Sequence, residues 1–578
     1  MLLWAAEKGP APINVPTLSV KDVHAGMHGV AYTVFEGTKV EAMDVEVLGV
    51  LRDANGPQSD IILVRLHGKK PEYTGVVAGM SGSPVYVDDK LVGAIAFRIG
   101  QFSKDPIAGV TPIADMLEIN ALDRTPMATR GVAGPAHRQV AKMSGDDATD
   151  PQAFSQYLQP IETPLVFSGF SEEAVRLFTP KFKEMGIVPV MGIGSASDRL
   201  QPEPLVAGSA VSAVLVRGDM NVAGTCTVTY VDAQRLLACG HPLLQFGQIE
   251  MPMTKAYVVA TLASPANAFK IVNTTEPVGA FVQDRHSGIL GEFGVSPQMI
   301  PVTLRVHGGT RAKEFHYEVL NNAKMTPVAI MTTVFNSLQG LNEYGEDATY
   351  RMDGKIRVAG YPDVAVQDMF APMDPSQPTA FAAAISVGER FTRIFDNPYA
   401  TPGIDGVTLD FEVLKERRWA RLESIRTDVT EARPGDEIRI EASLRPYRGE
   451  RIVEQIAVKI PTSTPKGTLR ILVSDGDTLD RGRRSPGPGR KLDLGSTIAL
   501  LNKEHNNDEL YVSLLEANPQ AMVEDKVMPT LPLSVMNVME GMRGTQDMVV
   551  VNESAVNEYS KPMDYVVTGA QVITVTIK

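Results

Sequence analysis

No run of apolar residues in this sequence approaches the roughly 18 residues that a helix needs to cross a bilayer. Positive charge is also scarce, because 55 Lys and Arg stand against 68 Asp and Glu and leave a net charge of -13. Nucleic-acid binding needs clustered Lys and Arg to neutralise phosphates. The sequence therefore predicts neither a membrane-spanning helix nor a nucleic-acid partner.

Motifs for metals and cofactors are missing as well. The sequence has no His-Glu-x-x-His, no cysteine pairs at zinc-finger spacing, no phosphate-loop Lys and no Gly-x-Gly-x-x-Gly after a strand. The stretch VSDGDTLDRG resembles a calcium loop, but it lacks the ligand spacing and the terminal Glu, so we expect a turn there. We therefore expect no metal and no cofactor.

Cysteine is rare, and both cysteines lie in one stretch, GTCTVTYVDAQRLLACGHPL. If this stretch is a hairpin with Asp232 and Ala233 at its tip, Cys226 and Cys239 face each other across the strands. Facing cysteines suit a disulfide and an oxidising compartment, whereas the alternative is two buried thiols. The opening MLLWAAEKGPAP is too short for a signal peptide and has no basic segment. We expect an exported protein, in the periplasm or at the cell surface.

What the sequence does contain is abundant Gly and Pro (49 and 40) between short Val/Thr/Ile runs, which predicts a mainly β protein with some α. A chain of 578 residues is too long for one core. We expect short helices in TPIADMLEI and SEEAVRLFTPKFKEMG and a longer one in PTAFAAAISVGERFTRIF, where apolar residues recur at helical spacing.

One loop has the composition of a nucleophile loop. In AGMSGSPVYVDDKLVGAIAF, Ser81 lies among small residues and precedes a strand, a tight turn and a second strand. Small neighbours let the backbone turn sharply and let a substrate carbonyl approach. The N–H groups of Gly79 and Ser81 are then the expected oxyanion hole. The alternative is a turn with no chemistry.

A nucleophilic serine needs a base, because its hydroxyl is barely ionised at neutral pH. His241, in LLACGHPL, closes the second strand of the expected hairpin and is our candidate. The alternative is a structural histidine. The other histidines lack such a context: His24, His28, His67, His137, His286, His307, His316 and His505.

These segments resemble a known family. VEVLGVL, TGVVAGMSGSPVYVDDKLVGAIAF and DPIAGVTPIADML are similar to the nucleophile region of the SpoIVB-type sporulation serine peptidases. GTCTVTYVDAQRLLACGHPL and TEPVGAFVQDRHSGILGEFG are similar to that family's histidine region. The resemblance covers about residues 20–122 and 205–310. It implies a chymotrypsin-like peptidase fold, with Ser81 as nucleophile and His241 as base.

Two features depart from the family. Ser81 precedes His241, whereas the family has the histidine region first, so the halves are permuted, and no PDZ-like module is evident. The family's aspartate would fall near His67. Asp284, in VQDRH after His241, suits the chymotrypsin arrangement better, and Asp60 is the alternative acid.

The expected function is a serine endopeptidase of restricted specificity acting on a protein or peptide. One alternative is a weak or inactive pseudopeptidase that serves as a binding or assembly module of the cell envelope, and another is a structural β protein of the surface. The expected fold is a chymotrypsin-like double β-barrel assembled from two separated segments, followed by an Ig-like β-sandwich. The expected parts are an N-terminal extension (1–19), a serine-bearing half-barrel (20–122), a linker and helical insertion (123–204), a histidine-bearing half-barrel (205–320), an α+β extension (321–420) and a β-sandwich domain (421–578).

Overall fold

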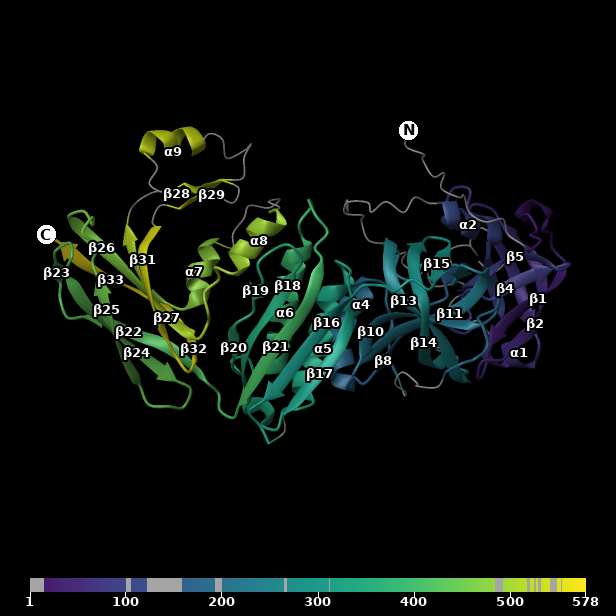
Figure 1. Ribbon diagram of the computed structural model, residues 1–578, viewed down its shortest axis with the longest axis horizontal. Helices are drawn as coiled ribbons and strands as arrows, with labels where there is room; N and C mark the ends of the chain where they lie inside the picture. Colours follow the sequence, from purple (N-terminus) through teal and green to yellow (C-terminus); the bar gives the residue numbers. More distant parts are fainter. Residues whose placement is uncertain are drawn as a thin grey trace, which may run out of the picture. The chain divides into compact units, whose positions relative to one another are not determined.

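The computed structural model is mainly β, as the sequence predicts (Figure 1). It divides into two compact units, Met1–Ile300 with Tyr317–Ala329, and Pro301–His316 with Ile330–Lys578. The structure describes residues 15–99, 105–121, 158–192, 200–264, 268–310, 312–483, 492–516, 520–523, 526–528, 532–540, 548–551 and 554–578. Most of the predicted N-terminal extension and of the predicted linker lies outside these residues.

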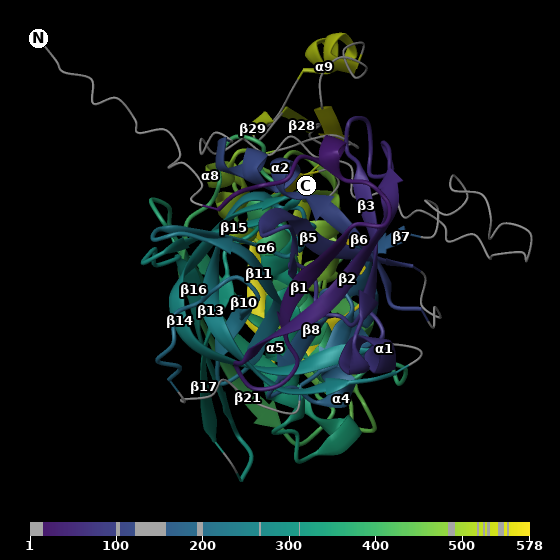
Figure 2. The same ribbon diagram turned by 90° about the vertical axis from the view of Figure 1, so that its right-hand side faces the viewer.

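The first unit begins with a closed barrel of six antiparallel strands, here called the first barrel. Its strands follow the order β4-β1-β2-β3-β6-β5, and β4 also pairs with β5, so the sheet closes on itself. Alternate residues of β2, such as Met43, Val45 and Val47, are buried in its core, as the two-residue period of a strand requires. Figure 2 looks onto β1, β2 and β3 side by side. The strands are β1 (His28–Val34), β2 (Val40–Leu51), β3 (Ile61–His67), β4 (Pro84–Val87), β5 (Lys90–Ile99) and β6 (Ile107–Pro112).

A second ring of six antiparallel strands follows in the same unit. The order is β10-β13-β14-β15-β12-β11, and β10 also pairs with β11, which closes the ring. We call it the second ring. Its strands are β10 (Ala210–Gly218), β11 (Asn221–Val231), β12 (Arg235–Ala238), β13 (Gly247–Leu262), β14 (Phe269–Arg285) and β15 (Gly288–Phe293).

Smaller elements flank the two rings. The predicted helix after residue 170 is confirmed as α4, where the Ser171 side chain accepts a hydrogen bond from the N–H of Ala174 (3.2 Å) and caps the helix. The predicted short helix of TPIADMLEI is confirmed as α2. These elements are η1 (Val20–Asp22), α1 (Lys69–Thr74), α2 (Ile113–Leu117), η2 (Glu118–Ala121), β7 (Leu158–Pro160), β8 (Leu165–Ser168), α4 (Glu172–Glu184) and β9 (Pro189–Met191).

The first barrel and the second ring pack against each other. One buried cluster joins Leu91, Ala94 and Met116 of the first barrel and its closing helix to Leu237 and Leu290 of the second ring. Figure 1 shows the purple strands β4 and β5 beside the teal strand β11. Each ring is too small to bury a large core alone, so this shared apolar surface explains why two segments separated in sequence fold as one unit.

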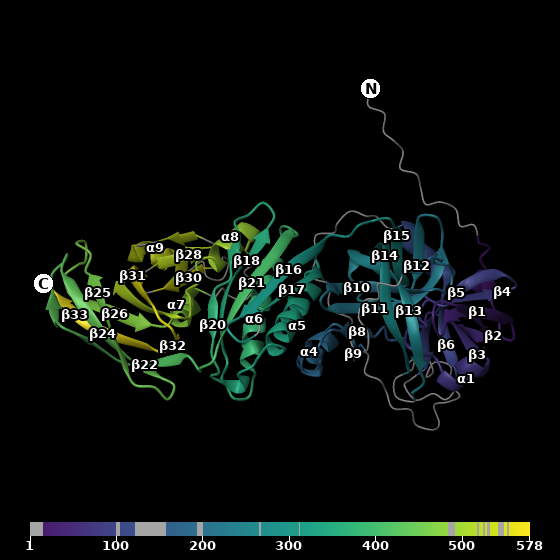
Figure 3. The same ribbon diagram turned by 60° about the horizontal axis from the view of Figure 1, so that its bottom comes forward.

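The second unit starts with a sheet covered by helices. β16 runs parallel to β21, which pairs antiparallel with β18. The helix predicted from PTAFAAAISVGERFTRIF is confirmed as α6, which lies along β18 (Figure 3). The elements here, including those through which the chain passes between the units, are β16 (Met299–His307), β17 (Lys313–Leu320), α5 (Met325–Gln339), η4 (Gly345–Asp347), β18 (Thr349–Val358), β19 (Val364–Ala365), β20 (Asp368–Phe370), α6 (Thr379–Phe395) and β21 (Ile404–Leu414).

The rest of the second unit contains two curled sheets that contribute to one buried cluster. Leu422 and Ile440 come from the four-stranded sheet β25-β24-β22-β32, and Ile471 and Val512 come from the five-stranded sheet β23-β33-β26-β27-β31. The elements are β22 (Trp419–Thr427), β23 (Glu431–Ala432), β24 (Glu437–Pro446), β25 (Ile452–Lys459), β26 (Gly467–Ser474), α7 (Gly476–Arg483), α8 (Leu494–Leu501), β27 (Glu509–Glu516), β28 (Gln520–Val523), β29 (Lys526–Met528), α9 (Leu533–Glu540), β30 (Met548–Val551), β31 (Ser554–Pro562), β32 (Val566–Thr568) and β33 (Ala570–Ile577).

Candidate active site

Ser81 lies at the tip of a tight loop that leads into β4. Gly79 and Gly82 flank it with φ of +97° and +94°, a backbone conformation that favours glycine. The loop is closed by Ser83, whose N–H and hydroxyl both donate to the carbonyl of Met80 (2.9 and 2.7 Å). Ser81 is fully buried, and within the described part of the chain its Oγ has no hydrogen-bond partner. A buried hydroxyl left without a partner is costly, which makes Ser81 a candidate functional residue.

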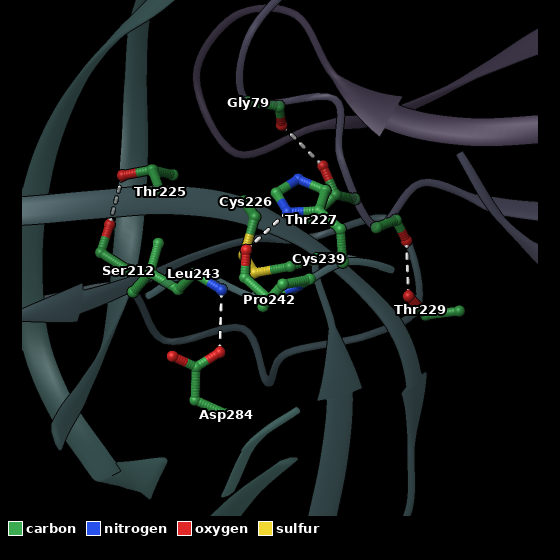
Figure 4. The surroundings of a disulfide bond; sticks show 12 residues. Gly79, Ser212, Thr225, Cys226, Thr227, Thr229, Cys239, Pro242, Leu243 and Asp284 are labelled. Atoms are coloured by element: carbon green, nitrogen blue, oxygen red, sulfur yellow. Dashed lines mark hydrogen bonds between the residues drawn. A yellow bond between two sulfur atoms is a disulfide. The ribbon is translucent and has the colours of Figure 1, made fainter. Parts of the chain in front are cut away.

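The loop of Ser81 is clamped to β11 of the second ring. The carbonyl of Ser81 accepts from the N–H of Thr227 (2.7 Å), and the carbonyl of Gly82 accepts from the hydroxyl of Thr229 (2.7 Å). Figure 4 shows a third bond, from the hydroxyl of Thr227 to the carbonyl of Gly79 (2.9 Å). These bonds fix the loop of Ser81 against the ring that carries His241.

The clamp leaves no room for a side chain at position 82. A Cβ on Gly82 would stand 1.9 Å from the carbonyl oxygen of Thr227 and 2.5 Å from the backbone nitrogen of Cys239. Cys239 is two residues before His241 in the chain. The close backbone approach at Gly82 therefore brings the serine loop next to the segment that carries the candidate base.

Two backbone N–H groups of the loop lack a backbone acceptor within the described part of the chain. The N–H groups of Met80, Gly82 and Ser83 donate to carbonyls of Val77, Ile95 and Met80 (3.0, 2.7 and 2.9 Å). Among the residues that the structure describes, the N–H groups of Gly79 and Ser81 have no such acceptor. Free donors on either side of one residue are what an oxyanion hole requires.

His241 lies between β12 and β13, and only 3% of it is exposed. Its Nδ1 is 2.7 Å from the carbonyl oxygen of Pro242. A carbonyl can only accept, so Nδ1 carries the proton and Nε2 is the basic nitrogen. Nε2 is buried, and no partner for it exists among the described residues. Burial lowers the pKa of His241 to about 4, so the ring is neutral and basic at neutral pH.

A disulfide joins Cys226 of β11 to Cys239, with 5.2 Å between the Cα atoms (Figure 4). The hairpin turn differs from the prediction. Val231 pairs with Leu236, so the turn is centred one residue-step later than the 232–233 tip expected from sequence. A register shift between Val228 and Tyr230 compensates and brings the two cysteines together. The disulfide holds the backbone that leads directly into His241.

Asp284, the predicted triad acid, is buried next to the loop that follows His241. Its two carboxylate oxygens accept from the N–H groups of Leu243, Leu244 and Phe246 (2.8, 2.8 and 3.2 Å). The hydrogen bond of His241 Nδ1 goes to the carbonyl of Pro242 instead of a carboxylate. In this geometry Asp284 orders the loop after His241, and it does not bind the ring.

The alternative acid, Asp60, lies immediately before β3, and its carboxylate binds groups other than His241. One of its oxygens is 2.5 Å from Arg52 Nη1, and the other accepts from the N–H of Asp53 (3.0 Å). His67, where the family's aspartate would fall, is 3.2 Å from a carboxylate oxygen of Glu46. Within the described ranges, the structure brings neither acid to the imidazole of His241.

Lys270 of β14 is a residue that the sequence interpretation missed. It is 2% exposed, and its Nζ donates to Thr33 Oγ1 (2.7 Å) and to the carbonyl of Gly79 (3.0 Å). Burial lowers the pKa of Lys270 to about 7. Lys270 alternates with Val272 and Thr274 along β14, so it lies on the buried face of the strand. A lysine at such a position is the sequence signal that would have found it. Its bond to the Gly79 carbonyl fixes the loop of Ser81 from the side of β14.

Among the comparisons with known proteins, a family model matches the serine-bearing part of the chain. Residues 6–117 match the family model described as SpoIVB peptidase S55. This match covers Ser81 and the first barrel and stops before the second ring. No curated protein and no solved structure matches the chain.

The described residues hold neither a metal-binding cluster nor a membrane-spanning helix. They contain no group of three or more His, Cys, Asp or Glu side chains arranged to hold a metal ion. None of the helices that the structure describes is long and apolar enough to cross a membrane.

Proposed function

We propose that this chain is a serine endopeptidase of restricted specificity, with Ser81 as the nucleophile and His241 as the general base. One observation carries the proposal: Ser81 Oγ and His241 Nε2 are both buried without partners in the described structure, on segments that are clamped together. The match of residues 6–117 to a peptidase family supports a protein or peptide substrate.

The geometry supports the following steps. Ser81 Oγ attacks the substrate carbonyl carbon while His241 Nε2 takes its proton. The N–H groups of Gly79 and Ser81 donate to the oxygen that becomes negative. The protonated His241 then gives its proton to the departing amine. Water next attacks the carbonyl carbon of the acyl-serine while His241 takes its proton, and this proton passes to Ser81 Oγ as the acid product leaves. No cofactor enters these steps.

The partner of His241 Nδ1 sets the expected rate. A carboxylate would stabilise the imidazolium that forms during attack, whereas the neutral carbonyl of Pro242 stabilises it less. We therefore expect a slow peptidase that depends on precise binding of its substrate. In this proposal Asp284 is a positioning residue for the loop that follows His241.

The proposal also includes the architecture and the compartment. The first barrel and the second ring would together form a chymotrypsin-like double barrel with its two halves in permuted order. The two curled C-terminal sheets would form an Ig-like sandwich. The Cys226–Cys239 disulfide supports an exported protein, in the periplasm or at the cell surface. The division into six parts stays a prediction.

The second candidate is a pseudopeptidase that acts as a binding or assembly module of the cell envelope. The observation that favours it is the Nδ1 bond of His241 to a backbone carbonyl in place of an acid. In that case the site around Ser81 and His241 would bind a peptide and leave it intact.

Cleavage of a peptide library separates the two candidates. The chain is incubated with the library, and new termini are identified by mass spectrometry. We expect cleavage at a small set of sites, lost in Ser81→Ala and retained in Ser83→Ala, because the N–H of residue 83 still donates to the Met80 carbonyl and closes the loop (2.9 Å). A library left intact by the folded wild-type chain would favour the pseudopeptidase.

A further inference from the structure

One edge of β5 is covered by two different segments of the chain. β4 pairs with β5 from Lys90 as far as Ala94, and β6 covers the opposite edge. β4 does not reach further, because the chain before it turns into the loop of Ser81. Beyond Ala94, β7 pairs with β5 in antiparallel register, with Arg98 facing Gln159 and Ile99 facing Leu158.

This part of β5 adjoins the nucleophile loop. The N–H of Gly82 donates to the carbonyl of Ile95 (2.7 Å). The next carbonyl along the strand, that of Ala96, accepts from the N–H of Ile161 (2.8 Å). A Cβ on Gly240, the residue before His241, would lie 3.1 Å from the Cβ of Ala96. A chain paired here is therefore next to both Ser81 and His241.

The segment binds as an extended peptide would. Ile161 is fully buried and belongs to the same apolar cluster as Val77, Ala78 and Met80, which lead into the loop of Ser81. Pro160 stands between Ile161 and the next pair, a position whose N–H would point away from β5, so its missing N–H costs no ladder bond. The backbone bonds would give affinity and the apolar cluster around Ile161 selectivity, as in strand addition.

The residue after Ile161 adds a charged contact with β5. Glu162 Oε2 lies 3.4 Å from Nη2 of Arg98, whose side chain is 7% exposed. Nε and Nη2 of Arg98 have no hydrogen-bond partner among the described residues. A buried guanidinium favours a carboxylate beside it. The site thus accommodates an aliphatic residue followed by an acidic one.

We propose that residues 158–162 are a built-in competitor: they occupy the edge of β5 at residues 96–99, where an extended peptide substrate would otherwise pair. The substrate would be an extended segment with a branched aliphatic side chain at the position of Ile161 and an acidic one after it. This proposal rests on the proposed function only for the cleavage of the bound peptide. Binding of the peptide needs no catalysis. A substrate must first displace the internal segment, which is present at a high effective concentration.

The test measures peptide binding in the full chain carrying Ser81→Ala, so that no cleavage occurs. The probe is a fluorescein-labelled synthetic peptide with the sequence of residues 157–163, followed by anisotropy. We expect Ile161→Asp to displace the internal segment, because a carboxylate is costly in an apolar pocket. The dissociation constant of the probe should then fall by about tenfold or more. Val572→Asp, which places the same carboxylate on an exposed residue of β33, is the matched control and should not change it.

Three outcomes decide the proposal. Tighter binding in Ile161→Asp, together with no binding of a probe whose Ile is replaced by Asp, supports it. Equal affinity in both chains overturns it, and so does equal binding of both probes. Because Ile161→Asp removes a buried side chain, Glu162→Lys is measured as a second variant, where repulsion from Arg98 should loosen the segment without opening the core. Labelling of Ser81 by a small phosphonate tests the proposed function separately.

Discussion

At the scale of single residues, the proposed mechanism depends on the two ring nitrogens of His241 and the hydroxyl of Ser81. His241 Nδ1 is bound by the Pro242 carbonyl, which leaves Nε2 as the base, and Ser81 Oγ has no other partner in the described structure. Burial is what keeps this histidine neutral. The same burial makes its protonation unfavourable, so the pH at which it titrates is a direct reading of its environment.

The peptidase rate should therefore have an acidic limb near pH 4. The pKa of His241 is lowered from 6.5 to about 4, so the base form is present through the whole range above that value. We expect kcat/KM to rise as the pH passes about 4 and to be level from pH 5.5 to 7. A pH–rate profile checks this. An acidic limb centred near pH 6.5 would mean that the ring is solvated.

The buried amine of Lys270 predicts that the free energy of unfolding depends on pH. Its pKa is about 7 in the folded chain and near 10.5 when unfolded, so between these values the unfolded state binds the extra proton. Stability should rise with pH across this window, by at most about 1.4 kcal/mol per pH unit. Lys270→Met should remove the rise. Urea unfolding at pH 7 and pH 9 measures it, and an unchanged slope in the variant would show that Lys270 is hydrated.

At the scale of elements, the loop of Ser81 and strand β11 act as one piece. Gly82→Ala should push the loop away from β11, because the new Cβ would meet the Thr227 carbonyl and the Cys239 nitrogen at under 3 Å. We expect a loss of about 3 kcal/mol of stability and of nearly all activity. Gly75→Ala is the control, since a Cβ there meets nothing within 4 Å although its φ is also positive. Equal effects of both variants would attribute the loss to backbone strain alone.

The disulfide is the second device at this scale. It closes a loop with a sequence separation of 13 residues, which is worth about 3 kcal/mol in the chain-entropy account. It also holds the backbone before His241. We expect the double variant Cys226→Ala, Cys239→Ala to unfold at a lower temperature and to lose activity below that temperature. Thermal unfolding and peptide cleavage at 25 °C check the two effects. Full activity in the variant would show that the clamp on Gly82 positions His241 unaided.

At the scale of the whole molecule, the sequence predicts helices and strands better than it predicts which strands pair to close a ring. Helix α4 follows from its Ser171 cap and its apolar spacing, and the strand-rich halves follow from short Val/Thr/Ile runs. The pairing of β10 with β11 closes the second ring. Which strands close a ring depends on packing between residues that no local pattern relates.

The candidate site shows the same division. Ser81, its glycines and His241 stand in recognisable local motifs. Asp284 was predicted from its place in the chain, yet its oxygens bind the backbone of a loop forty residues away in sequence. Lys270 and the pairing of β7 with β5 depend on contacts between distant segments. Such contacts are set by tertiary packing, which a single sequence does not reveal.

The most direct test of the central claim is covalent labelling of Ser81 by a small fluorophosphonate, located by mass spectrometry of the digested chain. The account predicts one adduct, on Ser81, because the reagent needs a serine with a base and free oxyanion donors. Labelling should be absent in Ser81→Ala, about a hundredfold slower in His241→Ala, and unchanged in Ser83→Ala. A folded chain that takes no label at Ser81, or labels equally fast without His241, would contradict the account.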